Sequence, residues 1–207
     1  MKIFITGCAK SGTTLLARLF NAFDCQVVNE EISLEGLIGI EHNGILVGKR
    51  SEYSIFSQIL NRKDFVKQKN LLDKVIVINV VRNGGDVFES FEASWGVWNP
   101  MIWCTAINEA RVNDNLIDIT VKYEDLIATP DVVQEMIAET LGLKILCDFT
   151  YYPLFVPEHC FKSNNERYLL QEIHNARIGK PFKLKRGIDI DYFNELMEYC
   201  GYDKHTS

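Results

Sequence analysis

The amino-acid sequence predicts an α/β fold in which helices cover both faces of a central parallel sheet. Segments typical of strands alternate with segments typical of helices, and this alternation favours βα units that build a parallel sheet. The run at 74–81 is almost continuously apolar and rich in β-branched residues, as parallel strands buried on both faces are. We therefore expect a three-layer α/β/α architecture.

Local start and stop signals help to place the elements. Asp86, with Glu89 three residues later, is typical of a capping box and predicts a helix start. Pro130 and Gly142 are expected near the first turn and after the last turn of another helix. Strands or extended segments are expected at 2–6, 25–28, 44–48, 74–81 and 116–122. Helices are expected at 13–23, 53–61, 86–94, 100–112, 130–141, 166–175 and 189–200.

Length and charge limit the class of protein. A chain of 207 residues with 47% apolar residues fits one domain with a substantial core, so we expect a single domain over 1–207. The formal net charge is −6, and the absence of a basic stripe argues against a nucleic-acid partner. The positive charges that stand out are local, at Lys10, Lys49, Arg82 and 183–186, and they favour a small anionic ligand.

The cysteines and apolar runs bear on the compartment. The 6 cysteines are irregularly spaced, none forms C-x-x-C, and the N-terminus does not resemble a signal peptide. Reduced thiols in a cytoplasmic protein are therefore expected. No apolar run approaches the length of a membrane span.

A glycine-bounded loop at 6–14 carries the clearest chemical signal. It reads Thr-Gly-Cys-Ala-Lys-Ser-Gly-Thr-Thr and lies between the first strand and the first helix, an arrangement that holds phosphate on backbone N–H groups. The nucleotide-binding pattern G-x-x-x-x-G-K-[ST] requires lysine where Thr13 stands. The lysine lies inside the loop, at Lys10, where it can sit over a group attached to the 5′-phosphate.

This loop, Lys10-Ser11-Gly12-Thr13-Thr14, resembles the 5′-phosphosulfate loop of sulfotransferases that use 3′-phosphoadenosine 5′-phosphosulfate (PAPS). The resemblance implies a P-loop-type α/β fold and transfer of a sulfuryl group from PAPS to a hydroxyl or amine acceptor. It implies that the loop binds the 5′-phosphate and that Lys10 neutralises charge as the bond to sulfur breaks.

A second site strengthens the resemblance. The strand at 74–81 ends in Arg82, and Ser90 follows eight residues later. The family binds the 3′-phosphate of its donor with an arginine and a serine at this spacing, where a strand turns into a helix. We expect Arg82 and Ser90 to face one pocket, with Ser90 in about the first turn of its helix.

Two further segments resemble the family less specifically. Residues 122–126 match its Tyr-Glu-Asp-Leu segment, which implies that Tyr123 lies near the adenine, although ordinary packing explains it equally well. The acids that follow it, Glu124 and Asp125, are expected to be structural and to cap the next helix. Residues 183–187 resemble a basic segment that closes over the 3′-phosphate, with Lys185 and Arg186 as candidates and a solvated turn as the alternative. They lie in the aromatic, loop-rich segment 144–187, for which we expect a lid or acceptor-binding role.

The catalytic base does not follow the family's commonest pattern. Cytosolic members have a histidine soon after the lysine that corresponds to Lys49. This chain has no histidine there, and His42, which is nearby in the sequence, matches no motif. Some N-sulfotransferases have a glutamate directly before this lysine, where this chain has Gly48. We prefer Glu31, which follows Glu30 and has the spacing of the base in tyrosylprotein sulfotransferases. Lys49 is expected to contact the sulfonate.

Two other functions stay open at this point. A P-loop kinase would need lysine at position 13 and an acidic magnesium ligand, and a non-catalytic nucleotide-binding relative would have lost its base. The sulfotransferase scheme requires no metal, and no residues show the spacing of metal ligands. The acceptor, whether a small molecule, a carbohydrate or a peptide hydroxyl, and the oligomeric state do not follow from the sequence.

Overall fold

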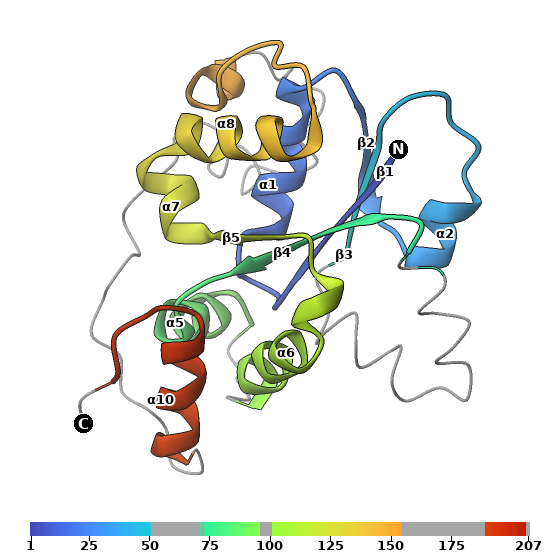
Figure 1. The fold of residues 1–207 in the computed structure, drawn as a ribbon. Coiled ribbons are helices and arrows are strands. Elements are labelled where there is room, and N and C mark those ends of the chain that lie inside the picture. Colours follow the sequence, from blue (N-terminus) through green and yellow to red (C-terminus); the bar gives the residue numbers. More distant parts are fainter. Residues whose placement is uncertain (51–70, 72, 96–100, 155–188, 206–207) are drawn as a thin grey trace.

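The computed structural model describes residues 1–50, 71, 73–95, 101–154 and 189–205 (Figure 1). The helices expected at 53–61 and 166–175 lie outside the described residues. The same holds for Lys185 and Arg186.

A five-stranded parallel sheet forms the centre of the molecule, and it confirms the predicted fold class. The strands have the order β2-β3-β1-β4-β5. Their bounds are β1 Lys2–Gly7, β2 Gln26–Glu31, β3 Leu46–Arg50, β4 Ile76–Val81 and β5 Ile119–Lys122. The last strand begins later than expected because a 3₁₀ turn, Asp114–Leu116, precedes it.

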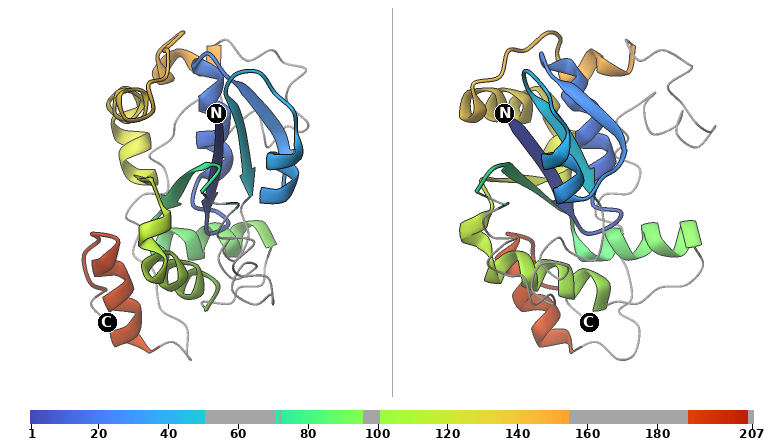
Figure 2. Two further views of the ribbon diagram at one scale, coloured as in Figure 1. Left: turned by 45° about the vertical axis from the view of Figure 1, so that its right-hand side comes forward. Right: turned by 90° about the vertical axis from the view of Figure 1, so that its right-hand side faces the viewer.

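Helices cover both faces of the sheet (Figure 1, Figure 2). One face is covered by α1 (Thr13–Leu19), α7 (Tyr123–Ala128) and α8 (Pro130–Leu141). The buried side chains shared by this layer and the strands include Ile5, Leu16, Val80, Leu126 and Ile137. The other face is covered by α2 (Leu34–Gly39) and by the end of α6 (Met101–Val112), and its core includes Phe4, Leu37, Val77 and Ala110.

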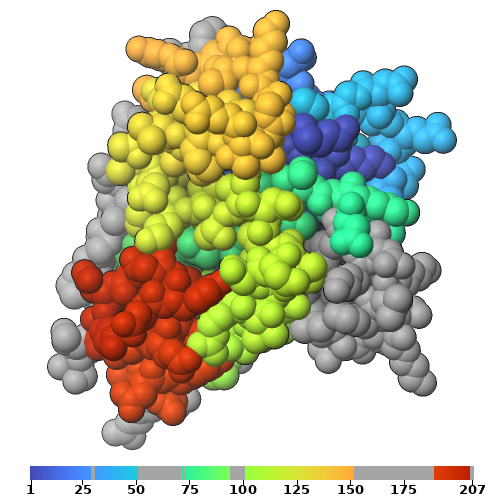
Figure 3. All heavy atoms as spheres, viewed as in Figure 1, coloured from blue at the N-terminus to red at the C-terminus, as the bar shows by residue number. Residues whose placement is uncertain are grey.

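A separate apolar cluster joins α5 (Gly84–Trp95), α6 and α10 (Ile190–Tyr199). Its centre is a group of three aromatic rings: the centroid of Phe193 lies 5.1 Å from that of Trp103 and 5.5 Å from that of Phe88. The helix α10 (red) lies against α6 (yellow-green) on the face seen in Figure 3.

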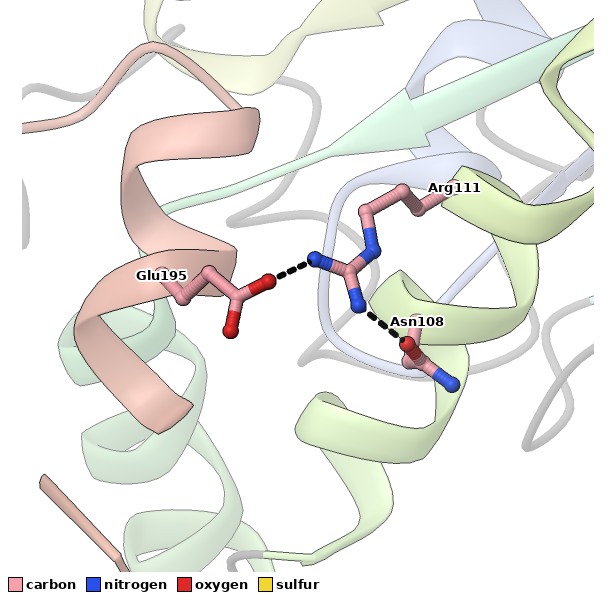
Figure 4. A network of polar contacts seen from close by, with 3 residues as sticks. All are labelled: Asn108, Arg111 and Glu195. Atoms are coloured by element: carbon pink, nitrogen blue, oxygen red, sulfur yellow. Dashed lines mark hydrogen bonds and ion pairs between the residues drawn. The ribbon is translucent and has the colours of Figure 1, made fainter. Parts of the chain in front are cut away.

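Polar contacts reinforce the pairing of α6 with α10. Arg111 on α6 donates to the carboxylate of Glu195 on α10, and its other terminal nitrogen donates to Asn108 at 2.9 Å (Figure 4). The hydroxyl of Tyr199 donates to Oδ1 of Asp114 at 3.0 Å. The helix expected at 189–200 is therefore present, and polar contacts attach it to α6 and to the turn that follows α6.

Several predicted boundaries were wrong. The helix expected to begin at Asp86 begins at Gly84, since the carbonyl of Asn83 accepts from the N–H of Val87 and its side chain accepts from Gly85. Asp86 is instead a buried residue of the first turn. The helix expected at 13–23 is split into α1 and a 3₁₀ turn, Phe20–Ala22. The short helices α2 and α7 were not predicted.

Candidate active site at the carboxyl ends of the strands

Five candidate residues lie at one edge of the sheet, because all five strands run in the same direction. Lys10 follows β1, Glu31 ends β2, Lys49 lies in β3, Arg82 follows β4 and Tyr123 follows β5. The connections after β1 and β4 leave these neighbouring strands in opposite directions. In open α/β sheets, ligands bind at such a switch point, outside the carboxyl ends of the strands.

The loop after β1 has a tight, specific backbone. Lys10 has a φ of 69°, the one positive φ among non-glycine residues that the structure describes. A residue other than glycine, asparagine or aspartate in this region is strained, and such strain gathers at functional sites. The backbone N–H and the hydroxyl of Ser11 both donate to the carbonyl of Cys8, at 3.1 and 2.6 Å. Ser11 therefore holds the shape of the loop from inside it.

The loop leads directly into α1. Gly12 occupies the N-cap position, and its carbonyl accepts from the N–H of Leu16 at 3.0 Å. The N–H groups of Thr13 and Thr14 belong to the first turn, where an α-helix offers no internal acceptor. Thr13 is buried and Thr14 is half-buried. The helix start can therefore present backbone donors to an anion.

Tyr123 joins the loop to Arg82. A Cβ on Gly12 would lie 2.3 Å from Cδ2 of Tyr123, so the tyrosine ring occupies the space that a side chain at position 12 would need. The guanidinium of Arg82 lies over the same ring, with Cζ 4.3 Å from its centroid. A cation stacked on an aromatic face is favourable, and Tyr123 thus supports the arginine as well as the loop.

The guanidinium of Arg82 is buried beside the loop. The side chain is 5% exposed, and Nη1 donates to the carbonyl of Lys10 at 3.1 Å. Its Nε has no hydrogen-bond partner among the described residues. A buried donor without an acceptor is costly, and a phosphate oxygen is a fitting acceptor for a guanidinium. The residues present therefore fit an anionic group.

The backbone of Arg82 is also fixed, by two residues whose role was not predicted. The indole N–H of Trp103 donates to the carbonyl of Arg82 at 3.0 Å. Oε1 of Glu124 accepts from the N–H of Asn83 at 3.0 Å. Glu124 therefore does not cap the following helix as expected, because its carboxylate is turned toward the end of β4. No motif marks either contact, since each joins segments far apart in the sequence.

Ser90 lies deeper in its helix than expected. Because α5 begins at Gly84, Ser90 is its seventh residue, about two turns along. The residue is buried. The pocket that it is expected to share with Arg82 stays a prediction.

Glu31 and Lys49 form an ion pair. The Nζ of Lys49 lies 2.6 Å from Oε1 of Glu31, and their side chains are 8% and 45% exposed. The two residues are register partners only because β2 is irregular between Val27 and Glu31. Bulges of this kind redirect side chains near active sites. The sequence placed both residues near the site, but the pair depends on this irregularity.

Close packing explains why position 48 is a glycine. A Cβ there would lie 2.7 Å from Ile32 and 2.9 Å from Leu37, on the face covered by α2. Because side chains alternate along a strand, Lys49 points to the opposite face. The side chain of a glutamate at position 48 would therefore enter the apolar layer. The carboxylate beside Lys49 comes from β2, from Glu31.

Cys8 is not a reactive thiol, although it lies in the loop. Burial raises its pKa to about 12, with a smaller contribution from Cys104. Because the thiolate is the reactive form, Cys8 acts as a small buried residue. Within the part of the chain that the structure describes, no group of three or more potential ligands can hold a metal ion, and no helix has the length and apolarity to span a membrane.

Comparison with solved structures places this architecture among sulfotransferase domains. The sulfotransferase domain from the curacin biosynthetic pathway is 15% identical, with a TM-score of 0.68 over 97% of each chain. The sulfotransferase domain from the Synechococcus PCC 7002 olefin synthase is 15% identical, with a TM-score of 0.60 over 98% of this chain and 95% of the other. Mouse sulfotransferase SULT7A1 complexed with PAP is 15% identical, with a TM-score of 0.47 over 70% of this chain and 59% of the other.

These likenesses show that the chain has the fold of sulfotransferase domains. No protein-family model and no curated protein matches the sequence.

Proposed function

We propose that the chain is a sulfotransferase that moves the sulfuryl group of PAPS to a hydroxyl or amine acceptor by in-line displacement. The observation that carries the proposal is the buried guanidinium of Arg82, docked on the carbonyl of Lys10 with its Nε unpaired among the described residues. The loop after β1 and the guanidinium of Arg82 adjoin at the β1/β4 switch point, which supports two neighbouring sites for anions. PAPS carries an anionic group for each site.

The loop holds the 5′-phosphate. The N–H groups of Gly12, Thr13 and Thr14 and the two threonine hydroxyls donate to it, while Ser11 keeps the loop in shape. Lys10 neutralises the oxygen that bridges phosphorus and sulfur as the bond from that oxygen to sulfur breaks. Stabilisation of developing charge by a fixed donor is worth about 3–4 kcal/mol.

The end of β4 orients the donor. Arg82 and Ser90 bind the 3′-phosphate, and Tyr123 supports the guanidinium and the adenine. Lys185 and Arg186, in the segment 144–187, close over the bound nucleotide. Fixing both phosphates places the sulfur for attack, which is how positioning contributes to the rate.

Glu31 acts as the general base. As the acceptor oxygen forms its bond to sulfur, Glu31 takes the acceptor proton, and the electron pair of the breaking bond passes to the phosphate oxygen beside Lys10. Lys49 holds the carboxylate in place at 2.6 Å and contacts the sulfonate. The resemblance of base spacing to tyrosylprotein sulfotransferases supports Glu31. We also propose a cytoplasmic location, which the irregular cysteine spacing supports.

Calorimetric titration with adenosine 3′,5′-bisphosphate tests the donor site, with ATP plus Mg²⁺ as the comparison. We expect tight binding of the bisphosphate without metal. Arg82→Ala should weaken it about 10- to 100-fold, since it removes hydrogen bonds to a charged group. Lys10→Ala should retain binding but lose turnover on a panel of hydroxyl acceptors.

Arg111→Ala is the control, because it removes an arginine whose terminal nitrogens donate to Glu195 and Asn108 and not to the loop. Binding of ATP–Mg²⁺ with no response to the 3′-phosphate would overturn the sulfotransferase function and favour a kinase. Normal turnover by Lys10→Ala would remove this residue from the mechanism.

A further inference from the structure

The chain after α10 returns to the end of β5, where residues 201–202 contact Lys122 and Glu124. The hydroxyl of Tyr202 donates to Oε2 of Glu124 at 2.6 Å. The ammonium of Lys122 donates to the carbonyl of Gly201 at 3.1 Å and lies 5.2 Å from the centroid of the Tyr202 ring. Residues 201–202 are therefore fixed to 122–124.

Glu124 connects this contact to the end of β4. Its other oxygen, Oε1, accepts from the N–H of Asn83 at 3.0 Å. Asn83 directly follows Arg82, and the carbonyl of Arg82 accepts from the indole of Trp103. The peptide unit between Arg82 and Asn83 is thus held at both its polar groups, by Trp103 on one side and Glu124 on the other.

The same short segment holds the side chain of Arg82. Tyr123, the neighbour of Glu124, lies beneath the guanidinium with its ring centroid 4.3 Å from Cζ. Residues 123–124 therefore contact both the backbone that follows Arg82 and its guanidinium group. A shift of Glu124 would move the guanidinium relative to the Lys10 carbonyl that it contacts at 3.1 Å.

The hydrogen bond from Tyr202 to Glu124 does not depend on pH in the physiological range. Burial, and then the charge of Glu124 and the hydrogen bond to it, raise the pKa of Tyr202 far above its usual value. The phenol therefore stays protonated and donates at every physiological pH. A hydrogen bond to a charged group is stronger than one between neutral groups.

We propose that Glu124 and Tyr202 are positioning residues for the 3′-phosphate site: through the N–H of Asn83 they set the guanidinium of Arg82 in the place where it reads the 3′-phosphate. This inference rests on the proposed function. It makes residues 201–202, after α10, part of the support of the donor site.

Tyr202→Phe is the sharpest test, because it removes one oxygen and keeps the ring over Lys122. The readout is the ratio of two dissociation constants, for adenosine 5′-phosphate and for adenosine 3′,5′-bisphosphate, measured by calorimetry on the full chain. We expect the dissociation constant for adenosine 5′-phosphate, divided by that for the bisphosphate, to fall about fivefold or more, which corresponds to about 1 kcal/mol. The affinity for adenosine 5′-phosphate itself should be unchanged.

Tyr199→Phe is the matched control. It also removes a phenol hydroxyl that donates to a carboxylate, that of Asp114 at 3.0 Å. It lies on α10 away from Glu124 and should leave the ratio unchanged. Glu124→Gln keeps an oxygen acceptor for Asn83 and should lower the ratio less than Glu124→Ala does.

The outcomes separate the two proposals. If the unaltered protein binds both nucleotides equally, the proposed function fails. If it prefers the bisphosphate and Tyr202→Phe has the same ratio, the positioning role is refuted. An equal loss of affinity for both nucleotides would also refute it, because that result indicates general support of the fold. Should Tyr202→Phe fail to fold, an unchanged ratio in Glu124→Gln and Glu124→Ala would overturn the inference.

Discussion

At the scale of single residues, Gly12 is held by two independent constraints. Its φ of 98° lies in the left-handed region, and the ring of Tyr123 fills the space beside its Cα. Either constraint alone favours glycine. Together they tie the loop after β1 to the residue that supports Arg82.

Gly12→Ala is expected to lower the free energy of unfolding by more than about 2 kcal/mol. The substitution adds a collision with the Tyr123 ring to a backbone strain of about 1–2 kcal/mol. Urea unfolding measures the loss. Binding of adenosine 3′,5′-bisphosphate should weaken in parallel, because the ring that supports Arg82 must shift.

Two other glycines separate these costs. Gly142 has a φ of 65° but no atom within 4 Å of a Cβ, so Gly142→Ala carries the backbone strain alone. Gly39 has neither feature, and Gly39→Ala should be neutral or slightly stabilising. Equal losses for Gly12→Ala and Gly142→Ala would show that the collision with Tyr123 is harmless.

Single residues of the site could be predicted where a motif fixes their spacing along the chain. Lys10 and Arg82 follow buried strands, and the parallel sheet brings them to one edge. The stacking of Arg82 on Tyr123 continues the register of Val81 with Lys122, which the sequence does not specify. The pairing of Glu31 with Lys49 needs the irregularity in β2.

At the scale of elements, the start of α5 depends on α10. Two glycines, Gly84 and Gly85, begin the helix, although glycine is a poor helix former. A Cβ on Gly84 would lie 2.8 Å from the ring of Phe193 and 3.2 Å from that of Trp103. Close packing against α10 and α6 therefore requires the glycine, and tertiary structure outweighs propensity.

Phe193→Ala should lower the free energy of unfolding by about 3–5 kcal/mol, because it leaves a cavity between Trp103 and Phe88. Urea unfolding measures the change. Val112→Ala, at an exposed position on α6, is the control and should change stability by less than about 0.5 kcal/mol. A loss below about 1 kcal/mol for Phe193→Ala would show that α10 is not essential to this cluster.

Element length explains which helices and strands could be predicted. The long helices α6, α8 and α10 and the buried strands have patterns that extend over many residues. The helices α2 and α7 have only 6 residues each, too few for a periodic pattern to emerge. Local contacts fix them instead: Ser33 caps α2 by accepting from the N–H of Gly36.

At the scale of the whole molecule, the parallel sheet gathers cations from several strands on a chain whose net charge is −6. Lys10, Lys49 and Arg82 come from the ends of β1, β3 and β4. An anion bound at this edge would link strands across the centre of the sheet. Binding should therefore stabilise the entire domain.

Adenosine 3′,5′-bisphosphate at 100 times its dissociation constant should add about 2.7 kcal/mol to the free energy of unfolding. For a chain of this size, this corresponds to a rise in melting temperature of about 5–10 °C. Scanning calorimetry measures the rise, which should persist in EDTA because side chains supply the positive charge. The same concentration should have less effect on Arg82→Ala. No rise with the unaltered protein would contradict the donor site.

The position of β1 in the sheet has a consequence for the order in which the molecule acquires its shape. β1 pairs with β3 and β4, so that Lys2 aligns with Leu46 and Ile3 with Ile76. Contacts between such distant residues slow folding, because long stretches of chain must first be brought together. Gly7 packs on the carbonyl of Val80, so the loop that follows it cannot settle before β4 docks. The loop after β1, near the beginning of the sequence, is therefore expected to be among the last parts of the candidate site to form.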